Sequence, residues 1–180
     1  MTPAERDELG RRISETAVLR GTFTLRSGKT SSYYVDKYRL TTEPGLLRRL
    51  TDALAERVPS GTQRIAGTAL GAVPLATALS LRTGLPAVFV RVDAAKGYGT
   101  SKSVEGVLEA GDQVLIVEDI VTTGGASIAA VDRLRAAGAT VVGVVAVVDR
   151  QQGGAESIAA EGVSFEALYT VAQLGIGEES

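Results

Sequence analysis

The sequence contains no cysteine and no histidine. Without cysteine the chain can form no disulfide, thiolate nucleophile or cysteine-ligated metal site. Without histidine it lacks the commonest zinc ligand and the side chain that most often acts as a general base near neutral pH. Any chemistry must therefore use carboxylates, lysine, tyrosine, hydroxyl groups, backbone dipoles or a hard cation bound by oxygen.

A long apolar run and an excess of positive charge are also missing. No window approaches the roughly eighteen apolar residues of a membrane span, and residues 1–12 are too polar for a secretory signal. The net charge of −2 gives no basic field that would attract nucleic acid or anionic lipid. A length of 180 residues with 44% hydrophobic residues suits one domain with a substantial core. We therefore expect a cytoplasmic, globular protein without nucleic-acid or membrane partners.

Segments typical of strands alternate with segments typical of helices. The first helix should begin at Thr2, because Thr2 and Glu5 can form a capping box around Pro3. The alternation predicts an α/β fold with a mostly parallel central sheet flanked by helices. The expected strands are residues 64–69, 86–92, 113–119, 140–149 and 164–170, with two short strands in residues 23–36 around a turn at Ser27-Gly28; the expected helices are residues 2–19, 43–58, 72–84, 125–138 and 154–161, and residues 93–106 are an expected loop.

The stretch VLIVEDIVTTGGAS, residues 114–127, carries the strongest functional signal. Glu118 and Asp119 close an apolar strand, and a loop of small and hydroxyl side chains leads into a helix. The start of a helix offers free N–H groups and a positive dipole end, so this loop suits a phosphate monoester. The two acids would repel a phosphate, so we expect them to face sugar hydroxyls or a divalent cation. The loop, called the phosphate loop below, consists of Thr122, Thr123, Gly124, Gly125, Ala126 and Ser127.

Two common nucleotide motifs do not fit this loop. It contains no lysine, so the Walker pattern fails, and Gly97-Tyr98-Gly99 opens no expected helix, so the dinucleotide fingerprint fails. The stretch instead resembles the phosphoribosyl diphosphate (PRPP) signature of the type I phosphoribosyltransferases. The resemblance implies that the acids contact the ribose hydroxyls and that the phosphate loop holds the 5′-phosphate. It also implies the type I phosphoribosyltransferase fold with a small N-terminal hood.

Other segments are similar to orotate phosphoribosyltransferases in particular. Residues 21–36 resemble their orotate-site segment, with Arg26 at its basic position, Tyr34 as the aromatic against the base and Tyr33 beside it. Residues 147–154 resemble the segment whose arginine, here Arg150, pairs with the orotate carboxylate. A planar guanidinium can meet a carboxylate through two parallel hydrogen bonds. The resemblance also brings Thr122 to the orotate site.

Residues 67–76 resemble the diphosphate loop of the family, which corresponds here to Ala69, Leu70 and Gly71. This segment follows an expected strand directly, as the phosphate loop does.

Residues 89–106 resemble the mobile catalytic loop of the family. Arg91 matches its leading arginine, while Val92 stands where a second cation is usual. Lys96 comes one residue late, and Tyr98 stands where the family has histidine. Lys96 and Lys102 are two of only four lysines in the sequence, which argues against an ordinary surface loop.

The resemblance implies transfer of ribose 5-phosphate from PRPP to orotate. Arg91, Lys96, Glu118 and Asp119 would be catalytic, and Mg²⁺ would be held mainly by the substrate, with Asp119 as a possible contact through water. It implies one domain over residues 1–180, with the core at about 60–150 and the hood from about 1–40 plus the C-terminal end. A homodimer with shared active sites is also implied. Two alternatives stay open, namely another nucleobase as acceptor, or a regulator that binds PRPP without turnover.

Overall fold

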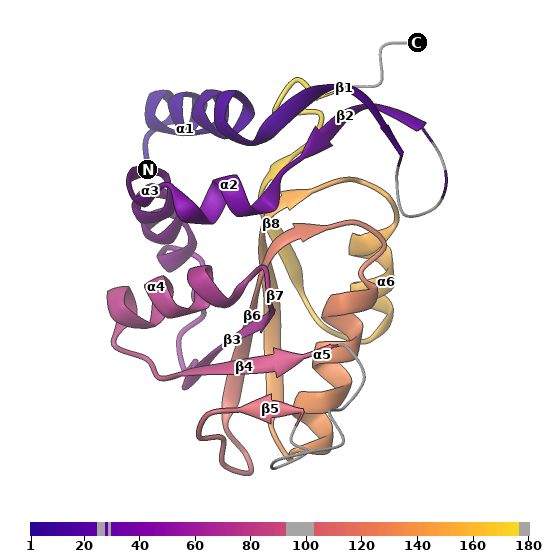
Figure 1. Cartoon of the computed structure of the whole chain (residues 1–180). Helices are drawn as coiled ribbons and strands as arrows, with labels where there is room; N and C mark the ends of the chain where they lie inside the picture. Colours follow the sequence, from indigo (N-terminus) through magenta and orange to yellow (C-terminus); the bar gives the residue numbers. More distant parts are fainter. Residues whose placement is uncertain (25–27, 29, 93–102, 177–180) are drawn as a thin grey trace.

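The computed structural model describes residues 1–24, 28, 30–92 and 103–176. Helices and strands alternate along most of the chain, as the sequence predicts (Figure 1). The helices are α1 (Pro3–Ala17), α2 (Lys37–Thr42), α3 (Pro44–Ala55), α4 (Val73–Thr83), α5 (Gly125–Ala136) and α6 (Gly154–Ala160). The strands are β1 (Val18–Thr24), β2 (Thr30–Val35), β3 (Arg64–Ala69), β4 (Ala87–Arg91), β5 (Val104–Glu105), β6 (Gln113–Val121), β7 (Thr140–Asp149) and β8 (Phe165–Thr170).

The start of α1 confirms the predicted capping box. The Thr2 hydroxyl accepts a hydrogen bond from the Glu5 amide at 3.3 Å, and the Glu5 carboxylate accepts one from the Thr2 amide at 2.7 Å. The helix ends at Ala17, two residues before the predicted end, because Val18 is already extended and pairs with Val35 of β2. Pairing with a strand thus sets the end of this helix.

The central sheet has six strands in the order β5-β4-β3-β6-β7-β8, and all neighbouring pairs except β4–β5 are parallel. The predicted loop at residues 93–106 is therefore wrong at its end, since Val104 and Glu105 pair with β4. Helix α2 was not predicted as a separate element. Asp36 begins it by accepting a hydrogen bond from the Tyr38 amide, and Pro44 then opens α3.

Hydrophobic cores lie on both faces of the sheet. On one face Leu115 and Val117 of β6 pack with the buried leucines of α3 and α4. On the other face Val114 and Ile116 belong to the core that includes Leu134 of α5 and Ile158 of α6. Figure 1 shows α3 and α4 on one side of the sheet and α5 and α6 on the other. This two-sided cover explains why β6 and β7 are almost continuously apolar rather than alternating.

The order of the strands in the sheet changes direction between β3 and β6. The chain runs from β3 outward to β4 and β5, and then returns to place β6 on the other side of β3. Open parallel sheets bind ligands at the carboxyl ends of the strands beside such a point. The two predicted loops follow β3 and β6 directly, and β7 lies next to β6. The fold thus brings together the diphosphate loop after β3, the phosphate loop after β6 and the segment of Arg150 after β7.

Strands β1 and β2 form a separate antiparallel pair outside the central sheet (Figure 1). The C-terminal segment lies against α1, where the Ser14 hydroxyl donates to the Leu174 carbonyl at 2.9 Å. Among the helices of the described residues, none is both long enough and apolar enough to cross a membrane.

Candidate active site

Glu118 and Asp119 are both buried at the carboxyl end of β6. The Glu118 carboxylate accepts hydrogen bonds from the hydroxyls of Thr68 in β3 and Ser127 in α5, the latter at 3.0 Å. Burial, reinforced by the neighbouring Asp119 charge, raises the Glu118 pKa to about 7, although the two hydroxyls oppose the shift. A buried carboxyl with a strongly raised pKa at a strand end is typical of a functional site.

The two carboxylate oxygens of Asp119 differ in their hydrogen bonding. Its Oδ1 accepts a hydrogen bond from the Ile120 amide at 2.7 Å. Its Oδ2 is buried without a hydrogen-bond partner among the described residues and lies 3.5 Å from the Lys37 ammonium. Buried polar atoms in folded proteins are nearly always paired, so an orphaned carboxylate oxygen suggests an absent ligand.

The phosphate loop leads into the first turn of α5. Gly124 adopts a left-handed φ of 83° and no side chain caps the helix, so the amides of the first turn keep their hydrogen-bonding capacity. A Cβ built on Gly125 would meet nothing nearer than the Thr123 hydroxyl at 4.0 Å, so packing within the protein does not require glycine there. These features fit an anion that approaches the backbone closely.

The diphosphate loop follows β3 and faces the acids. Its Ala69-Leu70 peptide bond is cis, and the Leu70 side chain is exposed. A Cβ built on Gly71 would lie only 1.9 Å from Asp119 Oδ2, so any larger residue would displace the carboxylate. Glycine at this position lets the two predicted segments come into direct contact.

Lys37 is the site residue that sequence reasoning missed. It opens α2, far along the chain from the predicted loops, yet its ammonium lies beside Asp119 and within 2.7 Å of the Cβ built on Gly71. No local pattern around Lys37 indicates this position. The only available signal was its rarity, because the chain has four lysines.

Arg150 follows β7 and faces Tyr33 of β2. Its guanidinium lies 5.3 Å from the Tyr33 ring centre and donates to the hydroxyl at 3.3 Å. Within the described residues, the buried Arg150 Nε has no hydrogen-bond partner. Tyr34 lies on the opposite face of β2, exposed, with its ring centre 5.7 Å from that of Phe23. The structure thus brings Tyr33, but not Tyr34, to Arg150, and the predicted contact of Tyr34 with the base stays a prediction.

Arg91 lies at the end of β4, paired in register with Ala69 of the diphosphate loop. Its side chain forms a half-exposed ion pair with Glu105 of β5 at 3.1 Å. The Val92 carbonyl accepts a hydrogen bond from Arg133 of α5 at 3.0 Å. The other predicted residues of these segments lie outside the described residues: Arg26, Lys96, Tyr98 and Lys102.

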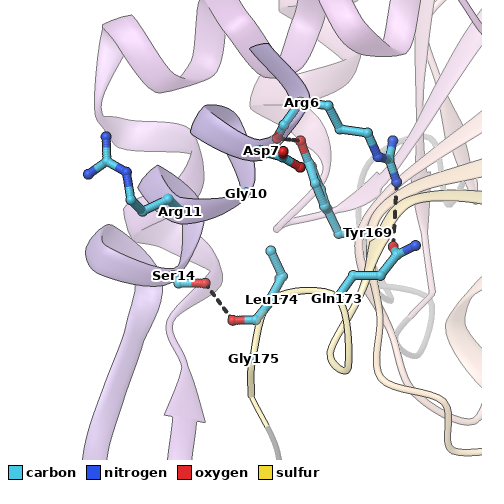
Figure 2. A pocket seen from close by; sticks show the side chains of 9 residues that line it. All are labelled: Arg6, Asp7, Gly10, Arg11, Ser14, Tyr169, Gln173, Leu174 and Gly175. Atoms are coloured by element: carbon cyan, nitrogen blue, oxygen red, sulfur yellow. Dashed lines mark hydrogen bonds between the residues drawn. The ribbon is translucent and has the colours of Figure 1, made fainter. Parts of the chain in front are cut away.

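A separate cavity of about 550 Å³ opens between α1 and the C-terminal segment (Figure 2). Arg6, Tyr169 and Gln173 line it, and none of its lining residues belongs to the predicted site. The Tyr169 hydroxyl donates to the Arg6 carbonyl at 2.6 Å, and the Arg6 guanidinium lies 4.7 Å from the Tyr169 ring centre. These contacts join α1 to β8.

Comparisons with known proteins identify the family. The model of the phosphoribosyl transferase domain matches residues 39–173. The orotate phosphoribosyltransferase of Methanocella arvoryzae is 45% identical over 168 residues, which cover 93% of this chain and 95% of the relative. That of Natronomonas pharaonis is 49% identical over 158 residues, 88% of this chain and 90% of the relative.

Solved structures agree with this result. The orotate phosphoribosyltransferase of Mycobacterium tuberculosis in complex with Fe(III) dicitrate superposes with a TM-score of 0.84 at 37% identity, covering 95% of this chain and 99% of that one. The same enzyme in complex with PRPP gives a TM-score of 0.76 at the same identity and coverage. The predicted type I phosphoribosyltransferase fold is confirmed, and the chain belongs to the phosphoribosyltransferase family, among its orotate phosphoribosyltransferases.

Proposed function

We propose that this protein transfers ribose 5-phosphate from PRPP to orotate, giving orotidine 5′-phosphate and diphosphate for pyrimidine biosynthesis. The observation that carries the proposal is the meeting of three strand ends. β6 brings the two acids and the phosphate loop, β3 brings the diphosphate loop, and β7 brings Arg150. The names of the relatives and the PRPP complex of the M. tuberculosis enzyme support the same substrates.

The reaction needs electrostatic stabilisation rather than a protein nucleophile. Breaking the bond between ribose C1 and diphosphate develops positive charge on the sugar ring and negative charge on the leaving group. Glu118 and Asp119 would hold the ribose hydroxyls, and the amides at the start of α5 would hold the 5′-phosphate. Arg91 and Lys96 would stabilise the leaving diphosphate. This division of roles suits a chain without cysteine or histidine.

Mg²⁺ belongs to the proposal as a partner of the substrate. Among the described residues, no group of three or more acidic, histidine or cysteine side chains could hold a metal ion by itself. The unpartnered Asp119 Oδ2 fits one contact, direct or through water, to an ion carried mainly by PRPP oxygens. Bound Mg²⁺ would neutralise charge on the diphosphate.

Orotate recognition would depend on Arg150. The Arg150 Nε is without a partner among the described residues, and Tyr33 holds the guanidinium from one side. A guanidinium fixed in this way can bind the orotate carboxylate through two parallel hydrogen bonds. Tyr34 would lie against the base, and Arg26 and Thr122 would complete the site. A purine has no carboxylate to pair with Arg150, which favours orotate over that alternative.

We further propose a homodimer in which the catalytic loop of one subunit reaches the site of the other. A largely apolar groove of about 360 Å³ between α3 and α4 supports association, because Leu81 on its wall is 84% exposed. Exposed apolar surface of this kind is typical of an interface between subunits. Leu81→Glu should shift the molecular mass measured by light scattering from dimer to monomer, whereas an unchanged mass would exclude this groove as the interface.

A cytoplasmic location of the protein stays a prediction.

The proposed activity is tested with purified protein, PRPP, Mg²⁺ and one base at a time. Loss of orotate is followed by absorbance, beside parallel reactions with adenine, hypoxanthine and uracil. Turnover with orotate alone is the expected result. Turnover with another base instead would reassign the acceptor. Tight PRPP binding without turnover of any base would favour the regulator.

A further inference from the structure

Lys37 reaches the candidate site from outside every segment that the sequence assigned to it. It opens α2, and its ammonium lies 3.5 Å from Asp119 Oδ2 at the end of β6. The Cβ built on Gly71 would lie 2.7 Å from the same nitrogen, so the ammonium also lies beside the backbone of the diphosphate loop. Lys37 therefore stands where the α2, β3 and β6 segments meet.

The diphosphate loop has no positive charge of its own. Residues 67–76 contain neither lysine nor arginine. A diphosphate group carries several negative charges, and backbone amides alone supply only partial charges against it. The Lys37 ammonium lies directly beside this loop. Arg91 is next to Ala69 in the sheet, but its side chain is paired with Glu105. The chain thus brings a full positive charge to the loop by tertiary contact.

The contact between Lys37 and Asp119 leaves both groups able to bind a ligand. Its 3.5 Å separation exceeds the range of about 2.7–3.2 Å that is usual for a hydrogen bond between nitrogen and oxygen. The Lys37 side chain is 39% exposed, whereas that of Asp119 is only 6% exposed. An ammonium held this loosely, with solvent on one side, can contact an incoming anion while it stays near the carboxylate.

We propose that Lys37 binds the diphosphate group of PRPP and supplies the positive charge that the diphosphate loop lacks. The inference rests on the proposed function, since it assigns one more residue to the same substrate. When PRPP is bound, Asp119 faces the ribose hydroxyls and Lys37 faces the diphosphate oxygens. As the bond to ribose C1 breaks, the ammonium stabilises the charge that develops on the leaving group.

The test compares three ligands that differ in the group that Lys37 would contact. Binding of PRPP with Mg²⁺, inorganic diphosphate with Mg²⁺, and orotidine 5′-phosphate is measured by calorimetry for the wild type and for Lys37→Ala. Orotidine 5′-phosphate fills the base, ribose and 5′-phosphate sites but carries no diphosphate. We expect the variant to bind PRPP and diphosphate about 10- to 100-fold more weakly, as for loss of one charge-assisted hydrogen bond, and orotidine 5′-phosphate nearly unchanged.

Two further variants complete the design. Lys37→Arg keeps the charge and should recover most of the diphosphate affinity. Arg39→Ala removes a positive charge from the same helix, where the exposed Arg39 side chain is 3.5 Å from Asp36, and should change none of the three affinities. Circular dichroism and thermal unfolding check that each variant is folded.

An equal loss of affinity for all three ligands would overturn the inference, because Lys37 would then act only by positioning Asp119. An unchanged affinity for diphosphate would overturn it as well. The PRPP and diphosphate measurements require no orotate, so a failure of the proposed function would be seen separately, in the turnover assay of the wild type.

Discussion

The Arg150 guanidinium lies 5.3 Å from the centre of the Tyr33 ring and donates a hydrogen bond to its hydroxyl, although 117 residues separate the two side chains. The contact ties the end of β7 to the separate β1–β2 pair. Arg150 is therefore held by an element outside the central sheet. This arrangement makes the orotate site dependent on the packing of the N-terminal strands.

Replacement of Arg150 should affect orotate rather than PRPP. Lysine keeps the charge but loses the planar fork, so we expect Arg150→Lys to lower kcat/KM for orotate about 10- to 100-fold, the value of a lost charge-assisted hydrogen bond. The PRPP affinity measured by calorimetry should stay the same. Arg135→Lys is the matched control, because Arg135 contacts Glu161 on the surface instead. Equal losses in the two variants would exclude a specific role for Arg150.

Removal of the Tyr33 hydroxyl tests whether it positions Arg150. Tyr33→Phe keeps the ring beneath the guanidinium and loses one hydrogen bond of 3.3 Å. The expected result is a rise of about 3- to 10-fold in KM for orotate, since one such bond contributes about 0.5–1.5 kcal/mol. Tyr34→Ala should raise the same KM more if Tyr34 lies against the base. A larger effect from Tyr33→Phe than from Tyr34→Ala would assign the base contact to Tyr33.

Glu118 should make the stability of the protein depend on pH. Its pKa is raised from 4.5 to about 7, so the folded state binds a proton more tightly than the unfolded state. The stabilising contribution is complete below pH 4.5 and is lost as the pH rises through about 7. The free energy of unfolding should therefore fall by up to about 3 kcal/mol between about pH 5 and pH 8.

Glu118→Gln should flatten this pH dependence, because glutamine does not titrate. Its amide oxygen can accept from one of the Thr68 and Ser127 hydroxyls, and its NH2 group can donate to the other. Denaturant unfolding at several pH values measures the effect. Glu8→Gln is the control. The hydrogen bond and ion pair with Arg49 lower the pKa of Glu8, so the Glu8 carboxyl affects the free energy of unfolding only in acid, below the pH range of the Glu118 effect. The prediction would be contradicted if the free energy of unfolding changed with pH equally in the wild type and in the Glu118→Gln variant.

Gly125→Ala should separate stability from phosphate binding. The new Cβ would meet nothing within 4 Å except the Thr123 hydroxyl at that distance, so the free energy of unfolding should stay the same or rise by up to about 1 kcal/mol. The affinity for PRPP should fall at least about 10-fold, because the methyl group would occupy space beside the bound phosphate. Calorimetry and thermal unfolding give the two values.

Gly138→Ala should show the opposite pattern. Gly138 has a left-handed φ of 88°, and its Cβ would lie 3.2 Å from Ala110, outside the site. The variant should be less stable by about 1 kcal/mol or more and should bind PRPP normally. If Gly125→Ala bound PRPP as tightly as the wild type, the phosphate loop would not hold the phosphate closely.

The Tyr169 hydroxyl should stabilise the contact between α1 and β8. It donates to the Arg6 carbonyl at 2.6 Å beside the cavity in Figure 2. Tyr169→Phe leaves that carbonyl without this donor, so the free energy of unfolding should fall by about 1 kcal/mol. Turnover of orotate should be unchanged, because the contact lies outside the proposed site. A loss of activity at full stability would show that this region takes part in function.

Features fixed by neighbours along the chain could be predicted from sequence. The capping box of Thr2 and Glu5 needs only residues three apart, and Gly84 ends α4 through its own left-handed φ of 76°. The acids and the phosphate loop form one continuous stretch, so their order after a strand was already visible. The same local character made the family recognisable, because its signature is also contiguous.

Features that depend on contacts across the sheet could not be predicted. Which of Tyr33 and Tyr34 faces Arg150 depends on which face of β2 is covered, because successive side chains point to opposite sides of a strand. The meeting of Lys37 with Asp119 depends on how α2 packs beside β6. Composition and periodicity describe neighbours within a few residues, whereas these contacts join segments that only the folded chain brings together. The sequence thus determined the kind of chemistry, and the tertiary structure decided which side chains share the site.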